Sequence, residues 1–178
     1  IPEQVYPLII LMISISLVLL MGMRSNHIIG SDTHMEYYIF LQTLSNEKWQ
    51  ILNKNTLDSC LSISIFPVIY QSFLNINPEY LFKILYPILF SISPLLVYII
   101  TREYLSEIYA FLASVFFMSQ NIFLMTTANS RTTVAILFFG LTIVVLLNGR
   151  LSEFVKKLLF IIFIFSCIVS HYSTTYIF

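Results

Sequence analysis

The residues best suited to chemistry lie in one short stretch, Gly30-Ser31-Asp32-Thr33-His34-Met35-Glu36-Tyr37-Tyr38. Asp32, His34 and Glu36 bring two carboxylates and an imidazole close together, although only 10 % of the chain is charged. The stretch directly follows an apolar run long enough to cross a bilayer. Ionisable groups are costly to keep beside lipid, so a cluster at the end of a membrane span indicates a functional site. The alternative is a polar loop that only caps a helix.

The local secondary structure decides which of these side chains point the same way. On a helix Asp32 and Glu36 share a face and His34 points elsewhere, whereas in an extended segment all three align. A pair of carboxylates can bind a divalent cation such as Mg²⁺ or Mn²⁺. One member can instead deprotonate a hydroxyl as a general base. Asp32 and Glu36 are therefore candidate catalytic residues and candidate metal ligands.

A second polar group, Ala128-Asn129-Ser130-Arg131-Thr132-Thr133, stands at the start of a later apolar segment. A helix N-terminus presents unpaired N–H groups, and Arg131 adds a fixed positive charge with a planar fork of donors. Together they suit a phosphate. The alternative is an ordinary Ser or Asn cap with an arginine that extends to lipid headgroups.

A third group, Ser170-His171-Tyr172-Ser173-Thr174-Thr175, lies in the last apolar segment. His171 is about 14 residues beyond Lys157, or roughly 21 Å along a helix, in a hydrocarbon core of about 30 Å. This places His171 in one half of the bilayer, on the side expected for Asp32 and Arg131. It is either part of a site or a partner in an ordinary hydrogen bond between helices.

The composition indicates a polytopic membrane protein. Hydrophobic residues make up 58 % of the 178 residues, and the mean hydropathy is +0.86. The formal net charge is zero and no basic patch is present, which excludes an electrostatic nucleic-acid binder. Cys60 and Cys167 lie in or beside apolar segments without metal-ligand spacing, so we expect both to be small core residues.

A bundle of transmembrane helices is the expected fold, and residues 1–178 form a single transmembrane domain, which we interpret as the N-terminal fragment of a longer protein. The five expected spans are 6–23, 79–100, 107–125, 132–148 and 157–176. The external loop 24–78 is too long for a simple connector. Within it, apolar residues at helical spacing over 37–44 predict an amphipathic helix at the interface, and the short apolar stretch 59–74 is expected to lie along the membrane surface.

The distribution of Lys and Arg predicts the orientation. Arg102, Arg150, Lys156 and Lys157 fall in two tight turns, whereas the other loops hold their basic residues at lower density. The denser face should be cytoplasmic, although Lys83 near the opposite surface weakens the bias. The three polar groups would then face the outside of the plasma membrane.

The three motifs, in this order and topology, resemble the N-terminal half of GT-C-type membrane glycosyltransferases. The resemblance is greatest to a poorly characterised, largely archaeal group of multi-spanning proteins in that class. It implies an all-α, GT-C-like fold and transfer of a sugar from a polyprenyl-phosphate donor to an acceptor of unknown identity. The chain departs from the commoner adjacent acidic pair, because His34 and Met35 stand before Glu36.

The resemblance also implies roles for individual residues. Asp32 would be the catalytic carboxylate and Glu36 its helper or a metal ligand. The residues expected to contact the substrate are Arg131, His171, His34 and Asn129. Membrane lipids and the lipid-linked donor are the expected partners. The main rival is a non-enzymatic membrane protein, either half of a transporter or a subunit of a complex. Transporters place their charges near the bilayer midplane, whereas these motifs gather at one surface.

Overall fold

The computed structural model describes residues 2–51 and 56–173 of the chain. All regular elements in these residues are helices. They are η1 (Glu3–Val5), α1 (Tyr6–Gly22), α2 (Ser31–Asn46), η2 (Thr56–Ser59), α3 (Ile65–Leu74), α4 (Pro78–Phe90), α5 (Ser93–Arg102), α6 (Glu107–Ser119), α7 (Asn121–Thr126), α8 (Ser130–Leu147) and α9 (Glu153–Ser170). The expected all-helical fold is confirmed. The last part of the expected fifth span, residues 174–176, lies outside the described residues.

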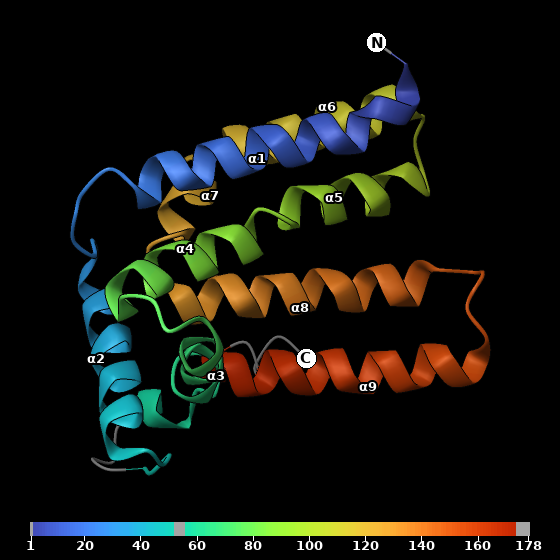
Figure 1. Cartoon of the computed structure of the whole chain (residues 1–178). Coiled ribbons are helices and arrows are strands. Elements are labelled where there is room, and N and C mark those ends of the chain that lie inside the picture. The colour runs from blue at the N-terminus through green and yellow to red at the C-terminus, as the bar shows by residue number, and fades with distance from the viewer. Residues whose placement is uncertain (1, 52–55, 174–178) are drawn as a thin grey trace.

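The long helices form a bundle, and α2 lies across one of its ends (Figure 1). Helices α1, α8, α9, the α4–α5 pair and α6 run alongside one another, up and down the bundle. Three stretches are long and apolar enough to cross a membrane: Glu3–Gly22, Pro78–Arg102 and Ser130–Leu147. They coincide with the first, second and fourth expected spans.

The other two expected spans differ from their sequence limits. The segment expected at 107–125 is divided into α6 and the short α7, with Gln120 in extended conformation between them. Helix α9 begins at Glu153 and ends at Ser170, so His171 is its extended C-terminal cap and not part of the helix. Within Pro78–Arg102, α4 ends at Phe90 and α5 starts at Ser93. Pro87 and Pro94 flank this break. Each removes a helical hydrogen bond, because proline has no backbone N–H.

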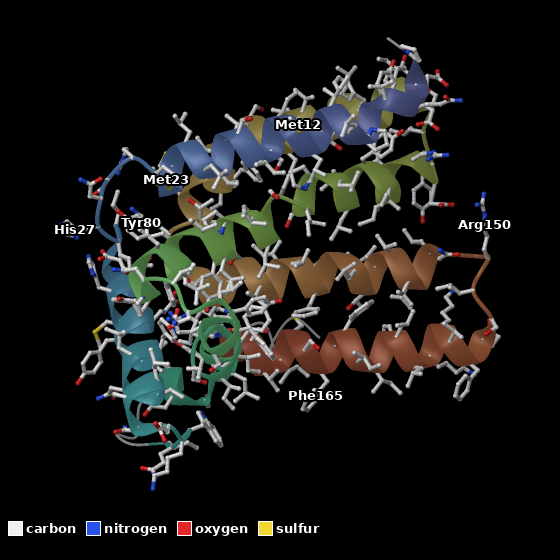
Figure 2. The ribbon with its side chains drawn as sticks, viewed as in Figure 1. Met12, Met23, His27, Tyr80, Arg150 and Phe165 are labelled. Carbon is white, nitrogen blue, oxygen red and sulfur yellow. The ribbon has the colours of Figure 1, made fainter. Side chains whose placement is uncertain are left out.

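The outer surface of the bundle carries large apolar side chains on α1, α6 and α9. Met12 on α1, Phe116 on α6 and Phe165 on α9 are 59 %, 68 % and 63 % exposed. Met12 and Phe165 point away from the bundle on different sides (Figure 2). Large side chains exposed over so wide a surface indicate contact with lipid, because a soluble monomer rarely leaves such a surface in water. The apolar surface of α6 and α9 thus matches that of the three long apolar stretches.

The two ends of the bundle carry different polar groups. The turn between α8 and α9, with Arg150, lies at the end opposite α2 (Figure 2). Arg102 at the end of α5 pairs with Glu107 at the start of α6, at 2.7 Å between Nε and Oε1. At the α2 end lie the start of α8, the end of α9 and the loops around them (Figure 1). The structure therefore brings the three polar groups of the sequence to one end of the bundle.

Candidate functional site

Helix α2 starts at Ser31, directly after a sharp turn of the backbone at its N-terminal cap residue, Gly30. Gly30 has φ +107° and ψ 134°, a conformation that glycine adopts without strain. It also touches the turn before α8, since a Cβ atom on Gly30 would lie 3.3 Å from the Cβ of Ala128. Asp32 in the first turn of α2 is favourable beside the positive end of the helix dipole. The acidic motif is therefore helical, and Asp32 and Glu36 share a face.

One face of α2 packs against the start of α8. The hydroxyl of the buried Thr33 donates a hydrogen bond to the carbonyl oxygen of Ala128. One turn further along, Glu36 is 0 % exposed and accepts a hydrogen bond from the backbone N–H of Ser130, at 2.8 Å. Glu36 thus fills the anion position at the N-terminus of α8. The α2–α8 joint is defined as Gly30, Thr33 and Glu36 with Ala128, Ser130 and Arg131.

Arg131 links both carboxylates of the acidic motif. Its Nε atom lies 3.2 Å from Oε1 of Glu36, and its Nη2 atom lies 3.4 Å from Oδ2 of Asp32. The Arg131 side chain is 12 % exposed and that of Asp32 is 57 % exposed. The two residues are 99 positions apart in the sequence. Of the two carboxylates, only Asp32 is open to a ligand, and Glu36 is held entirely inside the joint.

The third group meets Arg131 through Tyr172. The guanidinium carbon of Arg131 lies 5.5 Å from the centre of the Tyr172 ring, within the range of a cation–π contact. The His171 ring is 5.5 Å from the Tyr172 ring, centre to centre. The structure therefore places His171 beside the cluster through Tyr172.

The loop between η2 and α3 packs against the end of α9, next to the cluster. The backbone N–H of Leu61 donates to the carbonyl oxygen of Val169, at 2.9 Å, and the Ser62 hydroxyl donates to that of Ser170, at 2.9 Å. Cys60 is buried and lies next to the backbone of Tyr172. Burial raises the pKa of its thiol, so Cys60 is a packing residue rather than an activated nucleophile.

Two of the expected substrate contacts lie outside this set of contacts. His34 is on the exposed face of α2, as the helical alternative predicted, and its backbone N–H donates to Gly30. Asn129 is the N-terminal cap residue of α8, but its side chain makes no capping hydrogen bond. Asn129 contributes through its backbone, whose carbonyl oxygen accepts from the N–H of Thr133 at 3.0 Å.

Burial controls the charge of the joint. It raises the pKa of Glu36 above the ordinary 4.5, and the Ser130 N–H and the Arg131 charge oppose this shift. The Nη1 atom of Arg131 is buried and has no hydrogen-bond partner within the described residues. The guanidinium therefore keeps donor capacity beyond its two carboxylate contacts.

The acidic pair is bridged by Arg131 in this structure. The Arg131 guanidinium occupies the position between the two carboxylates that a metal ion would need. Within residues 2–51 and 56–173, no group of three or more His, Cys, Asp or Glu side chains is placed to hold a metal. A Mg²⁺ ion bound by both carboxylates would therefore displace the guanidinium and take most of its other ligands from water or a substrate phosphate.

Comparisons with known proteins give this chain no relatives: no family model, curated protein or solved structure matches it.

Proposed function

We propose that this chain is a membrane domain of a glycosyltransferase that uses a polyprenyl-phosphate-linked sugar, with its site on the external face of the plasma membrane. The observation that carries the proposal is the Asp32–Arg131 pair, which joins an exposed carboxylate to a buried guanidinium at one end of an apolar bundle. A lipid-linked donor lies in the membrane with its phosphosugar at the surface, so it would meet such a pair at the end of its hydrocarbon path.

The proposed reaction needs a base and a group that holds phosphate charge. The acceptor hydroxyl attacks the anomeric carbon, its proton passes to Asp32, and the bond from that carbon to the phosphate oxygen breaks. The lipid phosphate leaves with the bonding electrons. Asp32 is the catalytic residue in this scheme because it is exposed, and Glu36 is a positioning residue because it is buried in the joint. Arg131 would contribute its positive charge to holding the phosphate.

The reaction class is tested by Asp32→Asn, which keeps the shape of the side chain and removes its charge. In vesicles with a polyprenyl-phosphate sugar, we expect turnover to fall by about 10²-fold or more, the usual scale of a general base. Glu47→Gln is the matched control, since it makes the same carboxylate-to-amide change at an exposed residue at the other end of α2. Transfer by Asp32→Asn at the rate of the control would remove the proposed base.

A second pair of variants tests the phosphate role. Arg131→Lys keeps the charge without the planar fork, and Arg131→Ala removes both. If the fork holds phosphate, donor use should weaken with Lys and weaken further with Ala. Equal activity of Arg131→Lys and the unchanged chain across donor concentrations would contradict this role.

The non-enzymatic alternative has one observation in its favour. Arg131 lies beside two carboxylates, so with both ionised the cluster carries a net negative charge and repels a phosphate. In this alternative the α2–α8 joint is a structural lock, which means that its contacts only hold α2 against α8, in a transporter half or a complex subunit. The Asp32→Asn assay separates the two functions, because a lock depends on Glu36 more than on the exposed Asp32.

A further inference from the structure

A second polar feature lies beside the joint, in a cavity of about 240 Å³. Its walls come from the end of α1 and the following loop, the first turns of α2, α4, α7, the turn after α7 and the start of α8. It shares Gly30, Thr33, Ala128 and Ser130 with the joint, whereas neither Glu36 nor Arg131 lines it. Most of its surface is apolar, with Met21, Leu124 and Met125 among the lining side chains. The cavity is therefore a separate space from the Asp32–Arg131 pair.

Lys83 lines this cavity from α4 and is the unusual group in it. The residue is 8 % exposed, although lysine is almost never buried without a partner. Its ammonium donates one hydrogen bond to the backbone oxygen of Ser25 and lies 5.9 Å from the centre of the Tyr80 ring. An ammonium has three N–H donors, and burying its charge is costly unless an anion or several acceptors meet it.

The acidic residue at the right helical spacing to pair with Lys83 has other partners. Glu79, one helical turn before it, accepts a hydrogen bond from the backbone N–H of Ile28 and lies 3.3 Å from Nδ1 of His27. No aspartate or glutamate is among the described residues that line the cavity. Arg24, exposed at the end of α1, adds a second positive charge at the mouth. The cavity thus holds two cationic side chains and no anionic one.

We propose that this cavity binds the phosphate group of an anionic membrane lipid, with Lys83 inside and Arg24 at the mouth. The apolar wall formed by Met21, Leu124 and Met125 then contacts the first carbons of the lipid chains. The volume suits a headgroup rather than a whole ligand, since sites for drug-sized molecules occupy about 300–1,000 Å³. The site holds lipid whether or not the chain transfers sugar.

The position of Lys83 along its helix agrees with this ligand. Lys83 is five residues after Pro78, or about 7.5 Å along α4. The headgroup layer of a bilayer is about 5–8 Å thick on each side, from the difference between total and hydrocarbon thickness. If α4 crosses the membrane with Pro78 at its outer surface, the Lys83 ammonium lies near the boundary between the headgroup layer and the hydrocarbon, within reach of lipid phosphates.

Native mass spectrometry of the full chain in detergent micelles tests the site. The probes are phosphatidylglycerol, phosphatidylcholine and inorganic phosphate, each titrated against the unchanged chain and its variants. We expect phosphatidylglycerol to be retained most, and Lys83→Gln to weaken its binding by about tenfold or more. Lys48→Gln is the matched control, since Lys48 is exposed at the same end and does not line the cavity. Lys83→Arg should keep most of the binding because it keeps the charge.

Three outcomes overturn the proposal. Equal retention of phosphatidylglycerol and phosphatidylcholine would show that the charge is not recognised. Equal losses in Lys83→Gln and Lys48→Gln would place the lipid elsewhere. Binding of inorganic phosphate without retention of either lipid would assign the cavity to a free anion. If Lys83→Gln does not fold, the exposed Arg24→Gln variant carries the same test with a smaller expected loss.

Discussion

Replacing Arg131 by methionine tests the electrostatics of the α2–α8 joint. The variant leaves the Glu36 carboxylate buried with neutral partners alone in the joint, namely Ser130 and the backbone of residue 131. Removing one partner of a buried ion pair usually costs about 3–5 kcal/mol. Glu36 can avoid this unpaired buried charge, however, by taking up a proton. The cost of protonation then sets the upper limit for the pH-dependent part of the destabilisation.

That limit follows from the ordinary pKa of 4.5 for this carboxyl. Each pH unit above it is worth about 1.36 kcal/mol, so protonation costs about 3.4 kcal/mol at pH 7 and about 0.7 kcal/mol at pH 5. Burial raises the pKa of Glu36 in the folded chain, and loss of the Arg131 charge raises it further. Stability from such a group is fully present below pH 4.5 and is lost as the pH rises through the folded pKa. Arg131→Met should therefore be far more damaging at pH 7 than at pH 5.

Unfolding of the full chain in micelles by added dodecyl sulfate, followed by circular dichroism, measures the difference. The double variant Glu36→Gln with Arg131→Met has no carboxyl to protonate and should lose the pH dependence. Arg102→Met is a second control, since Arg102 is 55 % exposed in its pair with Glu107. Exposed pairs contribute about 0–1 kcal/mol. A destabilisation by Arg131→Met that is the same at pH 5 and pH 7 would refute the reasoning.

Two further predictions concern the backbone of the joint and the orientation. Gly30→Ala should destabilise the chain by about 1–3 kcal/mol, because φ is +107° and the new Cβ would crowd Ala128. Gly149→Ala, where nothing lies within 4 Å, should be neutral or slightly stabilising, and equal midpoints of unfolding for both variants would contradict the assigned strain. For orientation, a cysteine at Asn46 should react with an impermeant thiol reagent outside intact cells and one at Glu153 should not. Labelling at Glu153 alone would reverse the orientation, and background should be low since both native cysteines are buried.

The helical fold could be predicted from the sequence because long apolar runs leave few alternatives in lipid. The limits of α1 and α8 and the amphipathic helix over 37–44 follow from the same pattern. The end of α9 at Ser170 could not be predicted, since the run stays apolar or hydroxyl-bearing past that residue. The carbonyls at its end are instead satisfied by Leu61 and Ser62, over 108 residues in the case of Ser62 and Ser170. A contact of that range leaves no local signal.

The candidate site was predictable as a set of motifs and not as a geometry. The order of Asp32, Arg131 and His171 along the chain favoured one end of the bundle, where the structure places them. The spacing could not show which carboxylate is exposed and which is buried, because burial of Glu36 depends on packing against α8. Lys83 did carry a signal, as a lone charge in an apolar segment. Its significance became visible only with the cavity around it.

The long sequence distances across the joint have a consequence for biosynthesis. Glu36 and Ser130 are 94 residues apart, so a ribosome must add that length of chain before the contact can form. At a translation rate of about 5–20 residues per second, Ser130 is synthesised roughly 5–20 s after Glu36. During this time the carboxylates of α2 have no arginine from α8. The α2–α8 joint therefore forms late in synthesis. A variant that slows insertion of α8 would prolong the time during which Asp32 and Glu36 lack their contacts with α8.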